Sequence, residues 1–496
     1  MTDLATGIQH IRDDVNTQVI APAEMSVIGL IGTAGSADGT AFPLNTPIYL
    51  ATNDTVNRAL LGTAGTIPAA LAGISAQLTT EAAKIILVRV EEGGSTEETI
   101  ANMVGTEANH TGIWAFLDAP EELGLTPRLI IAPGYTSQTT EGIASATISN
   151  AGSGGADGTF ALAFTGGTGS GGAGTFTVAG GVVTAITITS PGAYTVAPTA
   201  SFAASTGLTG AAATLQLDQV ANGVVAAMPT ILERLKAMFL PEGPSSSRQD
   251  WLDWLETVPA SARIMHPLRQ DAKVLDAEGD VITQPLSPFV IGIYVARDSA
   301  NGGIPSGSAA NQPIYGLVGV TPTIRLSLTD ATSEGQADIT AHGGIVVRGE
   351  AGVESAAGSG GFAFWGFDTL AADTAWAFVP VNRMRDQIEL GQVQAEKFYL
   401  GKYNITVQTV QAIINTISGQ LADLAAGGHI LPSYRVYFEP DKNSPDDLRA
   451  GSVTVSFACE EPPVLKKITI YSRRYSQALT DLVQTISVQL GTGQSS

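Results

Sequence analysis

The sequence contains a single cysteine, Cys459, and only 25 lysine and arginine residues among its 496 positions. One thiol excludes an intrachain disulfide framework and any metal site built from several cysteines. The basic residues are outnumbered by 46 aspartates and glutamates, which leaves a formal net charge of −21. Because a surface this acidic repels a phosphate backbone, we expect no direct contact with nucleic acid.

Long apolar runs are also missing. No window approaches the roughly 18 uninterrupted apolar residues that a membrane-spanning helix needs, so no membrane insertion is expected. The N-terminal residues MTDLATGIQHIRDDVN contain acids and lack the apolar core of a signal peptide. Together with the lone cysteine, these absences predict synthesis and assembly in a reducing cytoplasm.

The signatures of catalysis and cofactor binding are weak or missing. A formal GxGxxG occurs at Gly169–Gly174, but a strand pattern follows it where a dinucleotide site requires a helix, so we interpret it as a turn. Neither a GxSxG elbow nor a P-loop is present. The five histidines do not have the spacing of metal ligands; they are His10, His110, His266, His342 and His429. The sequence therefore assigns no catalytic, cofactor-binding or metal-binding residue, and we expect a protein that is not an enzyme.

Apolar residues make up 44% of the chain, enough for several cores, and the length suggests more than one domain. Short apolar runs and amphipathic helical patterns succeed one another in the N-terminal third. Strands are predicted at 26–32, 47–50, 84–90 and 127–133, and a helix at 66–78. This succession indicates a multi-domain α/β (α+β) fold class. A further apolar run at 286–296 is interpreted as another buried strand.

A glycine-rich segment at 141–219 interrupts this pattern. Between Glu141 and Asp218 its only charged residue is Asp157, while β-branched and aromatic residues recur with a period of two. The pattern predicts an inserted all-β domain, after which a helix is predicted at 220–239. The insert is interpreted either as a surface decoration or as a weak adhesin-like module that touches glycans.

The C-terminal region predicts two helices and then strands. The helices are expected at 382–400 and 406–424, and the strands at 435–438, 452–457 and 468–471. Residues 484–490 alternate apolar and polar side chains, which predicts a final strand with nothing after it to pair with. A locally basic stretch precedes this strand and contains Lys466, Lys467, Arg473 and Arg474. It is either a solvated edge strand protected from aggregation or a contact with an acidic partner.

Five stretches carry a resemblance that spans most of the chain. They are MSVIGLIGTAGSADGTAFPLNTPIYL, KIILVRVEEG, HTGIWAFLDAPEELGLTPRLIIAPGY, QPIYGLVGV and GFAFWGFDTLAADTAWAFVPVNRMRDQIE, in this order. The sequence resembles the contractile tail sheath family of myophage tails and R-type pyocins over roughly residues 10–135 and 220–490. The insert at 141–219 is not part of that resemblance.

The resemblance implies a tail-sheath fold with extended arms at both ends. The expected parts are an N-terminal arm (1–24), a middle α/β region (25–140 and 220–362), the β insert on the exterior, a conserved mixed-sheet C-terminal domain that faces the tube (363–480), and a C-terminal arm (481–496). Each arm would complete a β-sheet in a neighbouring subunit. The arm residues expected to be buried there are Ile8, Ile11, Ile486, Val488 and Leu490.

The resemblance also implies partners and a location. We expect a homo-oligomer of stacked rings or a helical sheath around an inner tail tube protein, with baseplate and tail terminator proteins as further partners. It would contract to drive the tube through the host envelope during genome delivery. We expect it in the virion, as part of a phage tail assembled in the host bacterial cytoplasm. A β-rich surface adhesin, another virion decoration protein and an α/β enzyme are the alternatives.

Basic residues of the C-terminal region are candidates for contacts with an acidic tube. They are Arg383, Arg385, Lys397, Lys466, Lys467, Arg473 and Arg474. For Arg383, the alternative is an ion pair with Asp386 on a solvated helix face, because the two residues are three positions apart.

Overall fold

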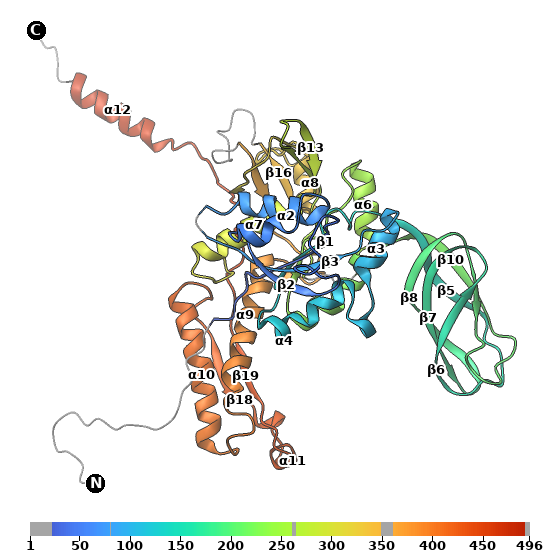
Figure 1. Cartoon of the computed structure of the whole chain (residues 1–496). Helices are drawn as coiled ribbons and strands as arrows, with labels where there is room; N and C mark the ends of the chain where they lie inside the picture. The colour runs from blue at the N-terminus through green and yellow to red at the C-terminus, as the bar shows by residue number, and fades with distance from the viewer. Residues whose placement is uncertain (1–21, 80, 260–263, 349–360, 492–496) are drawn as a thin grey trace, which may run out of the picture. The chain divides into compact units, whose positions relative to one another are not determined.

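The computed structural model describes residues 22–79, 81–259, 264–348 and 361–491. The fold is mixed α/β with several separate sheets (Figure 1). The chain divides after Pro463 into a large N-terminal unit and a small C-terminal unit. Ile8 and Ile11, which the sequence places in an N-terminal arm, lie outside the described residues.

A five-stranded sheet forms the centre of the large unit. Its strands lie in the order β11 (Met238–Phe239), β4 (Leu129–Ile131), β1 (Ile28–Thr33), β3 (Lys84–Val90) and β2 (Pro47–Ala51). Only β2, at one edge, runs antiparallel to its neighbour. Ile85 and Leu87 enter one hydrophobic core, whereas Ile86 and Val88 enter another. Since both faces of the sheet are covered, its strands need no polar alternation, which explains their continuous apolar runs.

Helices cover the two faces of this sheet. α2 (Thr66–Ala76) and α7 (Ser287–Ala300) supply residues to the first core, and α5 (Gly223–Leu235) and α6 (Arg248–Thr257) to the second. Met103 of α3 (Thr96–Val104) also belongs to the second core. The helices predicted at 66–78 and 220–239 are confirmed, although the latter ends before β11.

The prediction of a strand at 286–296 is wrong, because these residues form most of α7. Every residue from Ser287 to Val295 is buried, so no exposed polar position marks a helical period. Pro288 lies in the first turn, where a missing backbone N–H costs nothing. A short apolar run of this kind does not distinguish a buried helix from a buried strand.

Shorter elements complete this part of the chain. They include α1 (Thr55–Ala59), α4 (Ala119–Leu123), and the 3-10 helices η1 (Glu107–Asn109) and η2 (Gly112–Leu117). β12 (Asp271–Leu275) pairs with β13 (Val281–Gln284) and β15 (Gly319–Thr321). β17 (Ala363–Trp365) pairs with β14 (Gln312–Pro313) and β16 (Ile345–Val347). α8 (Glu334–Thr340) precedes β16, and η3 (Thr374–Trp376) follows β17.

The glycine-rich segment forms a group of β-strands (Figure 1). These six strands have a hydrophobic core of their own. They are β5 (Thr140–Asn150), β6 (Gly158–Thr165), β7 (Thr168–Ala179), β8 (Val182–Val196), β9 (Thr199–Ser201) and β10 (Ala212–Val220). Leu162, Phe176 and Val183 are buried in this core. The first and last strands pair with each other, so that Thr140 lies opposite Val220 and Ile143 opposite Leu217. The chain therefore enters and leaves the insert on adjacent strands.

Replacing residues 143–217 with a short Gly-Ser linker is expected to leave the rest of the chain folded. The cut joins residues that are already cross-strand partners, and the insert has a separate core. A closing loop of any moderate length adds little entropic cost. Circular dichroism and thermal unfolding of the purified variant test this. Loss of the cooperative transition would contradict it and would mean that the insert supports the main cores.

The C-terminal part of the large unit contains two helices and a small sheet. α9 (Val379–Glu396) and α10 (Val407–Ala426) confirm the two predicted helices. β18 (Arg435–Phe438) pairs with β19 (Val455–Ala458), with η4 (Pro440–Lys442) and α11 (Pro445–Arg449) between them. Met384, Ile388, Ile417 and Leu421 join α9 to α10 in a separate core.

Two strand predictions near the C-terminus are wrong. Residues 468–471 have no regular secondary structure, and residues 484–490 belong to α12 (Gln477–Leu490). The apolar alternation at 484–490 covers only half of a longer pattern. When the preceding turns of α12 are included, the apolar residues lie three or four positions apart, the spacing of one helix face. They are Leu479, Leu482, Val483, Ile486 and Leu490.

A buried carboxylate, Glu242, joins three segments near the end of the central sheet. It accepts hydrogen bonds from the backbone N–H of Gly134 at 2.9 Å and of Ser287, the first residue of α7, at 2.7 Å. The Thr136 hydroxyl donates to the backbone oxygen of Glu242 at 3.0 Å. Burial raises the pKa of Glu242 to about 7 in spite of these donors.

The folded chain is expected to lose stability as the pH rises from about 4.5, the ordinary pKa of glutamate, to about 7. In this window Glu242 keeps its proton in the folded state and releases it in the unfolded state. The stability that comes from the protonated side chain is therefore complete below the window and lost above it. A shift of this size corresponds to about 3 kcal/mol in the free energy of unfolding. Denaturant unfolding at several pH values should show a flatter profile for Glu242→Gln. Parallel profiles for the two proteins would refute the assignment.

Candidate functional site

Within the described ranges, no group of three or more His, Cys, Asp or Glu side chains is placed to hold a metal ion. Among the same residues, no helix combines the length and the apolarity needed to cross a membrane. Two other features stand out: buried polar contacts to the segments near the two ends of the large unit, and large apolar side chains that are exposed.

The segment that leads into β1 is held in place by buried polar contacts. From Pro22 to Met25 the side chains alternate between exposed and buried, as in an extended chain. Ala23 and Met25 are almost completely buried. Glu24 is half exposed and forms an ion pair with Lys84 at 2.7 Å. The position of this segment therefore depends on what lies against its buried side.

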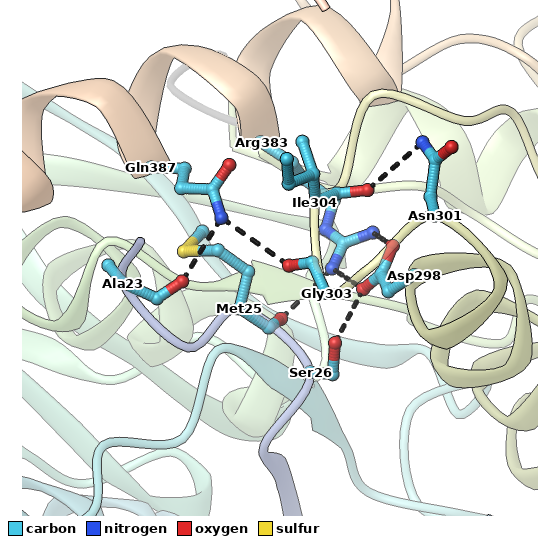
Figure 2. A network of polar contacts seen from close by, with 9 residues as sticks. All are labelled: Ala23, Met25, Ser26, Asp298, Asn301, Gly303, Ile304, Arg383 and Gln387. Atoms are coloured by element: carbon cyan, nitrogen blue, oxygen red, sulfur yellow. Dashed lines mark hydrogen bonds and ion pairs between the residues drawn. The ribbon is translucent and has the colours of Figure 1, made fainter. Parts of the chain in front are cut away.

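A buried ion pair between α7 and α9 lies on that side (Figure 2). The Arg383 guanidinium donates to both carboxylate oxygens of Asp298, at 3.0 and 2.5 Å. Only 4% of the Arg383 side chain and 1% of the Asp298 side chain are exposed. The guanidinium also lies over the Tyr294 ring, 5.5 Å from its centroid. Burial raises the pKa of Tyr294, so this phenol stays neutral.

The pair and a neighbouring amide bind residues 23–26 directly (Figure 2). Arg383 donates to the backbone oxygen of Met25 at 2.9 Å, and the Ser26 hydroxyl donates to Asp298 at 2.8 Å. Gln387, one helical turn after Arg383, donates to the backbone oxygens of Ala23 at 3.1 Å and Gly303 at 3.4 Å. Helix α9 thus ties the N-terminal segment to the loop that follows α7.

The loop after α7 is fixed by a second group of contacts. Asn301 donates to the backbone oxygen of Ile304 at 3.3 Å (Figure 2) and to the hydroxyl of Ser306 at 2.9 Å. Ser306 is hydrogen-bonded to Nδ1 of His429 at 2.8 Å, beyond the end of α10. Burial lowers the pKa of His429. The N-terminal segment, the α7 loop and the C-terminal helices are therefore parts of one connected network.

Arg385 of α9 ties the start of the C-terminal region to its last residues. Its guanidinium donates to both carboxylate oxygens of Glu461, at 2.7 and 2.9 Å, and to the backbone oxygen of Cys459 at 2.9 Å. Only 19% of the Arg385 side chain and 4% of the Glu461 side chain are exposed. The hydrogen bonds to Glu461 raise the pKa of Arg385, and burial raises the pKa of Cys459 to about 11. This pair fixes the chain two residues before the large unit ends.

These positions bear on the predicted set of tube contacts, which stays a prediction. Arg383 and Arg385 point into the protein, where their charges are already paired, so neither presents a free charge at the surface. Arg383 pairs with Asp298 and not with Asp386, the partner considered from sequence spacing. The remaining basic candidates are exposed: Lys397, Lys466, Lys467, Arg473 and Arg474.

The turn between α9 and α10 presents both basic and apolar side chains. Lys397 and Lys402 are exposed there, and the ammonium of Lys402 lies 4.8 Å from the centroid of the Phe398 ring. Phe398 packs against Tyr399 and Tyr403, with ring centroids 5.3 and 5.4 Å apart. Large apolar side chains beside them are exposed, including Leu400 at 77% and Val407 at 82%.

Apart from the partly buried Val464, the large apolar side chains in the described part of the small C-terminal unit are exposed. They lie in the irregular stretch before α12 and along α12 itself: Leu465, Ile468, Ile470, Tyr471, Tyr475, Leu479, Leu482, Val483, Ile486, Val488 and Leu490. An isolated helix of 14 residues is only marginally stable in water. This unit therefore has the composition of a segment that packs against a partner.

The sheet formed by β18 and β19 has unpaired outer edges in the described part of the chain. Each strand pairs only with the other. Two-stranded sheets are marginal alone and gain stability from further strands. Open edges of this kind accept an extended segment from another chain.

Asp298, Gln387 and Glu461 were missed by reasoning from the sequence. Asp298 offered a signal, since an acid that follows the apolar run of residues 289–295 has to be paired if that run is buried. Gln387 lies four positions after Arg383, on the same helix face. Glu461 follows Glu460, and nothing in the sequence separates the buried acid from the exposed one.

Comparison with known proteins gives matches along nearly the whole chain, although no family model matches the sequence. The tail sheath protein of Escherichia phage P2 is 21% identical over 497 residues, which cover 98% of this chain and 100% of that protein. The major tail sheath protein of Serratia phage KSP20 is 31% identical over 145 residues, 28% of this chain and 36% of the relative.

Solved structures share the fold at low sequence identity. The contracted helical sheath of the anti-feeding prophage matches with a TM-score of 0.57 at 12% identity, over 96% of this chain and 100% of that one. The contracted sheath complex of the extracellular contractile injection system PVC matches with a TM-score of 0.56 at 13% identity, with the same coverage.

Proposed function

We propose that this chain, a member of the contractile tail sheath family, is the repeating subunit of a sheath that polymerises around an inner tail tube. The observation that carries the proposal is the similarity to tail sheath proteins along the full length of the chain, in sequence and in fold. Contraction of the sheath would drive the tube through the host envelope during genome delivery. The subunit would be assembled in the bacterial cytoplasm and would reside in the virion tail, with baseplate and terminator proteins at the ends of the sheath.

Subunits are joined, in this proposal, by exchange of C-terminal segments. The irregular residues 464–475 of one copy add as a strand to an open edge of the β18–β19 sheet in a second copy. Ile468 and Ile470, two positions apart, would then face the same side and lose their contact with water. Each backbone hydrogen bond contributes about 0.5–1.5 kcal/mol, so a strand of five or six residues makes a firm joint. The N-terminal arm, with Ile8 and Ile11, would form a second joint, and the β insert would lie on the sheath exterior.

Negative-stain microscopy of the purified full-length chain tests the proposal. Hollow tubes or rings are expected, because a sheath subunit carries its own joints. Dispersed particles at high protein concentration, also in the presence of preformed tail tubes, would overturn it.

The tube contact is reassigned to the turn between α9 and α10. Reversing Lys397 and Lys402 to Glu is expected to reduce the number of sheaths that load onto tubes at low salt. Exposed charge pairs contribute only about 0–1 kcal/mol each, but the contact repeats in every subunit. At about 1 M salt, where screening is strong, variant and wild type should load alike.

Charge reversal of Lys273 in β12 is the matched control and should leave loading unchanged at both salt concentrations. Equal loading by the Lys397/Lys402 variant and the wild type at low salt would remove this turn from the interface. The basic stretch from Lys466 to Arg474 would then be the next candidate.

A further inference from the structure

The contacts to residues 23–26 are made mainly to the backbone. Arg383 and Gln387 each bind a carbonyl oxygen of this segment, and among its buried polar contacts only that of Ser26 uses a side chain (Figure 2). A buried ion pair is a weak source of stability, because apolar residues of similar volume often serve equally well. Polar groups at this position can select one alignment of the segment, because their hydrogen bonds reach particular carbonyl oxygens. Apolar groups cannot make this distinction.

The spacing of the contacts supports this. Arg383 and Gln387 are one turn apart on α9, a rise of about 6 Å along the helix. They bind the carbonyls of Met25 and Ala23, which are two residues apart, about 6.6 Å in an extended chain. The spacing of the two side chains along the helix therefore matches the spacing of the two carbonyl oxygens along the segment, which runs antiparallel to the helix. A slip by one residue would turn the carbonyls away and would expose Ala23 and Met25, which are now buried.

We propose that Arg383, Asp298 and Gln387 form a clamp that sets the register of residues 23–26. The clamp fixes the point from which the preceding arm starts and transmits any pull on it to α7 and α9. Asp298 orients Arg383 through a bidentate contact and accepts the Ser26 hydroxyl. The three are positioning residues, and the inference rests on the proposed function, in which the arm joins one subunit to the next.

The test uses two variants of the full chain. Arg383→Met/Asp298→Leu removes both charges together, so that neither is left buried alone, and Gln387→Met removes the second contact without touching a charge. Both should melt within about 5 °C of the wild type. Amide exchange of peptides covering 22–28 should accelerate at least about tenfold in the monomer. The yield of tubes should fall by a similar factor.

Lys84→Met is the control, because Lys84 contacts the same segment only through the exposed Glu24 side chain. It should leave exchange and tube yield unchanged. Wild-type exchange rates in both clamp variants would overturn the clamp, whatever the tubes do. If the double variant does not fold, Gln387→Met decides. Failure of the wild type to form tubes would count against the proposed function, while the exchange measurement still decides the clamp.

Discussion

Removal of residues 464–496 is expected to give a folded chain that no longer assembles. Apart from the partly buried Val464, the described side chains of this segment are exposed, and none belongs to the hydrophobic cores. Its loss therefore leaves every residue of those cores in place. It does remove the apolar residues that we assign to the joint between subunits. Sedimentation velocity should show a monomer, and thermal unfolding should give the wild-type melting temperature. Microscopy should show no tubes.

Two further variants separate the roles of the strand and the helix. Deleting 477–496 removes α12 and keeps the stretch that contains Ile468 and Ile470. Replacing Ile486 and Val488 with Asp places charges on α12 without shortening the chain. Weakened tubes after the first change would assign a share of the joint to the helix. Long tubes formed by the chain that lacks 464–496 would rule out the exchange of C-terminal segments.

Replacing Glu461 with Lys is expected to cost the large unit about 3–5 kcal/mol of unfolding free energy, the range for a broken buried ion pair. The change leaves Arg385 without its carboxylate, between the rings of Trp376 and Phe457, and places a second cation beside it. Denaturant unfolding measures the loss. The double variant Arg385→Glu/Glu461→Arg should recover part of it, because the charges again oppose each other.

Asp446 provides the control, since its ion pair with Arg449 is exposed on both sides. Asp446→Lys should scarcely change stability. A loss at Glu461 no larger than at Asp446 would show that the Arg385 pair is not structural. Such a result would return Arg385 to the set of residues available for contacts with a partner.

The sequence predicted elements well where one face differs from the other. α2 and α10 have a stripe of buried side chains with more exposed side chains between them, so their period is visible. α7 has no such contrast, because packing covers all sides of its apolar run. At 484–490 three alternating apolar residues fit a strand pattern, although these residues belong to a helix whose apolar stripe begins at Leu479.

The candidate site was harder to predict than the fold. Basic residues on α9 stand out in the sequence, but a sequence does not show which face of a helix is covered by a residue 85 positions away, as Asp298 covers Arg383. Residues 468–471 have the composition of a strand and pair with no strand among the described residues. A strand pattern shows that a segment can form a strand. Whether it does depends on a pairing neighbour that the sequence does not identify.

The pairing of Thr140 with Val220 makes the insert an exchangeable module. A foreign domain whose own ends lie one strand spacing apart, about 5 Å, would meet the same two strands and leave the cores on either side untouched. In a tube built of identical subunits, every copy would carry one. An enzyme, an antigen or a metal-binding domain grafted between Thr140 and Val220 would then be displayed in a regular array, with a spacing set by the sheath itself.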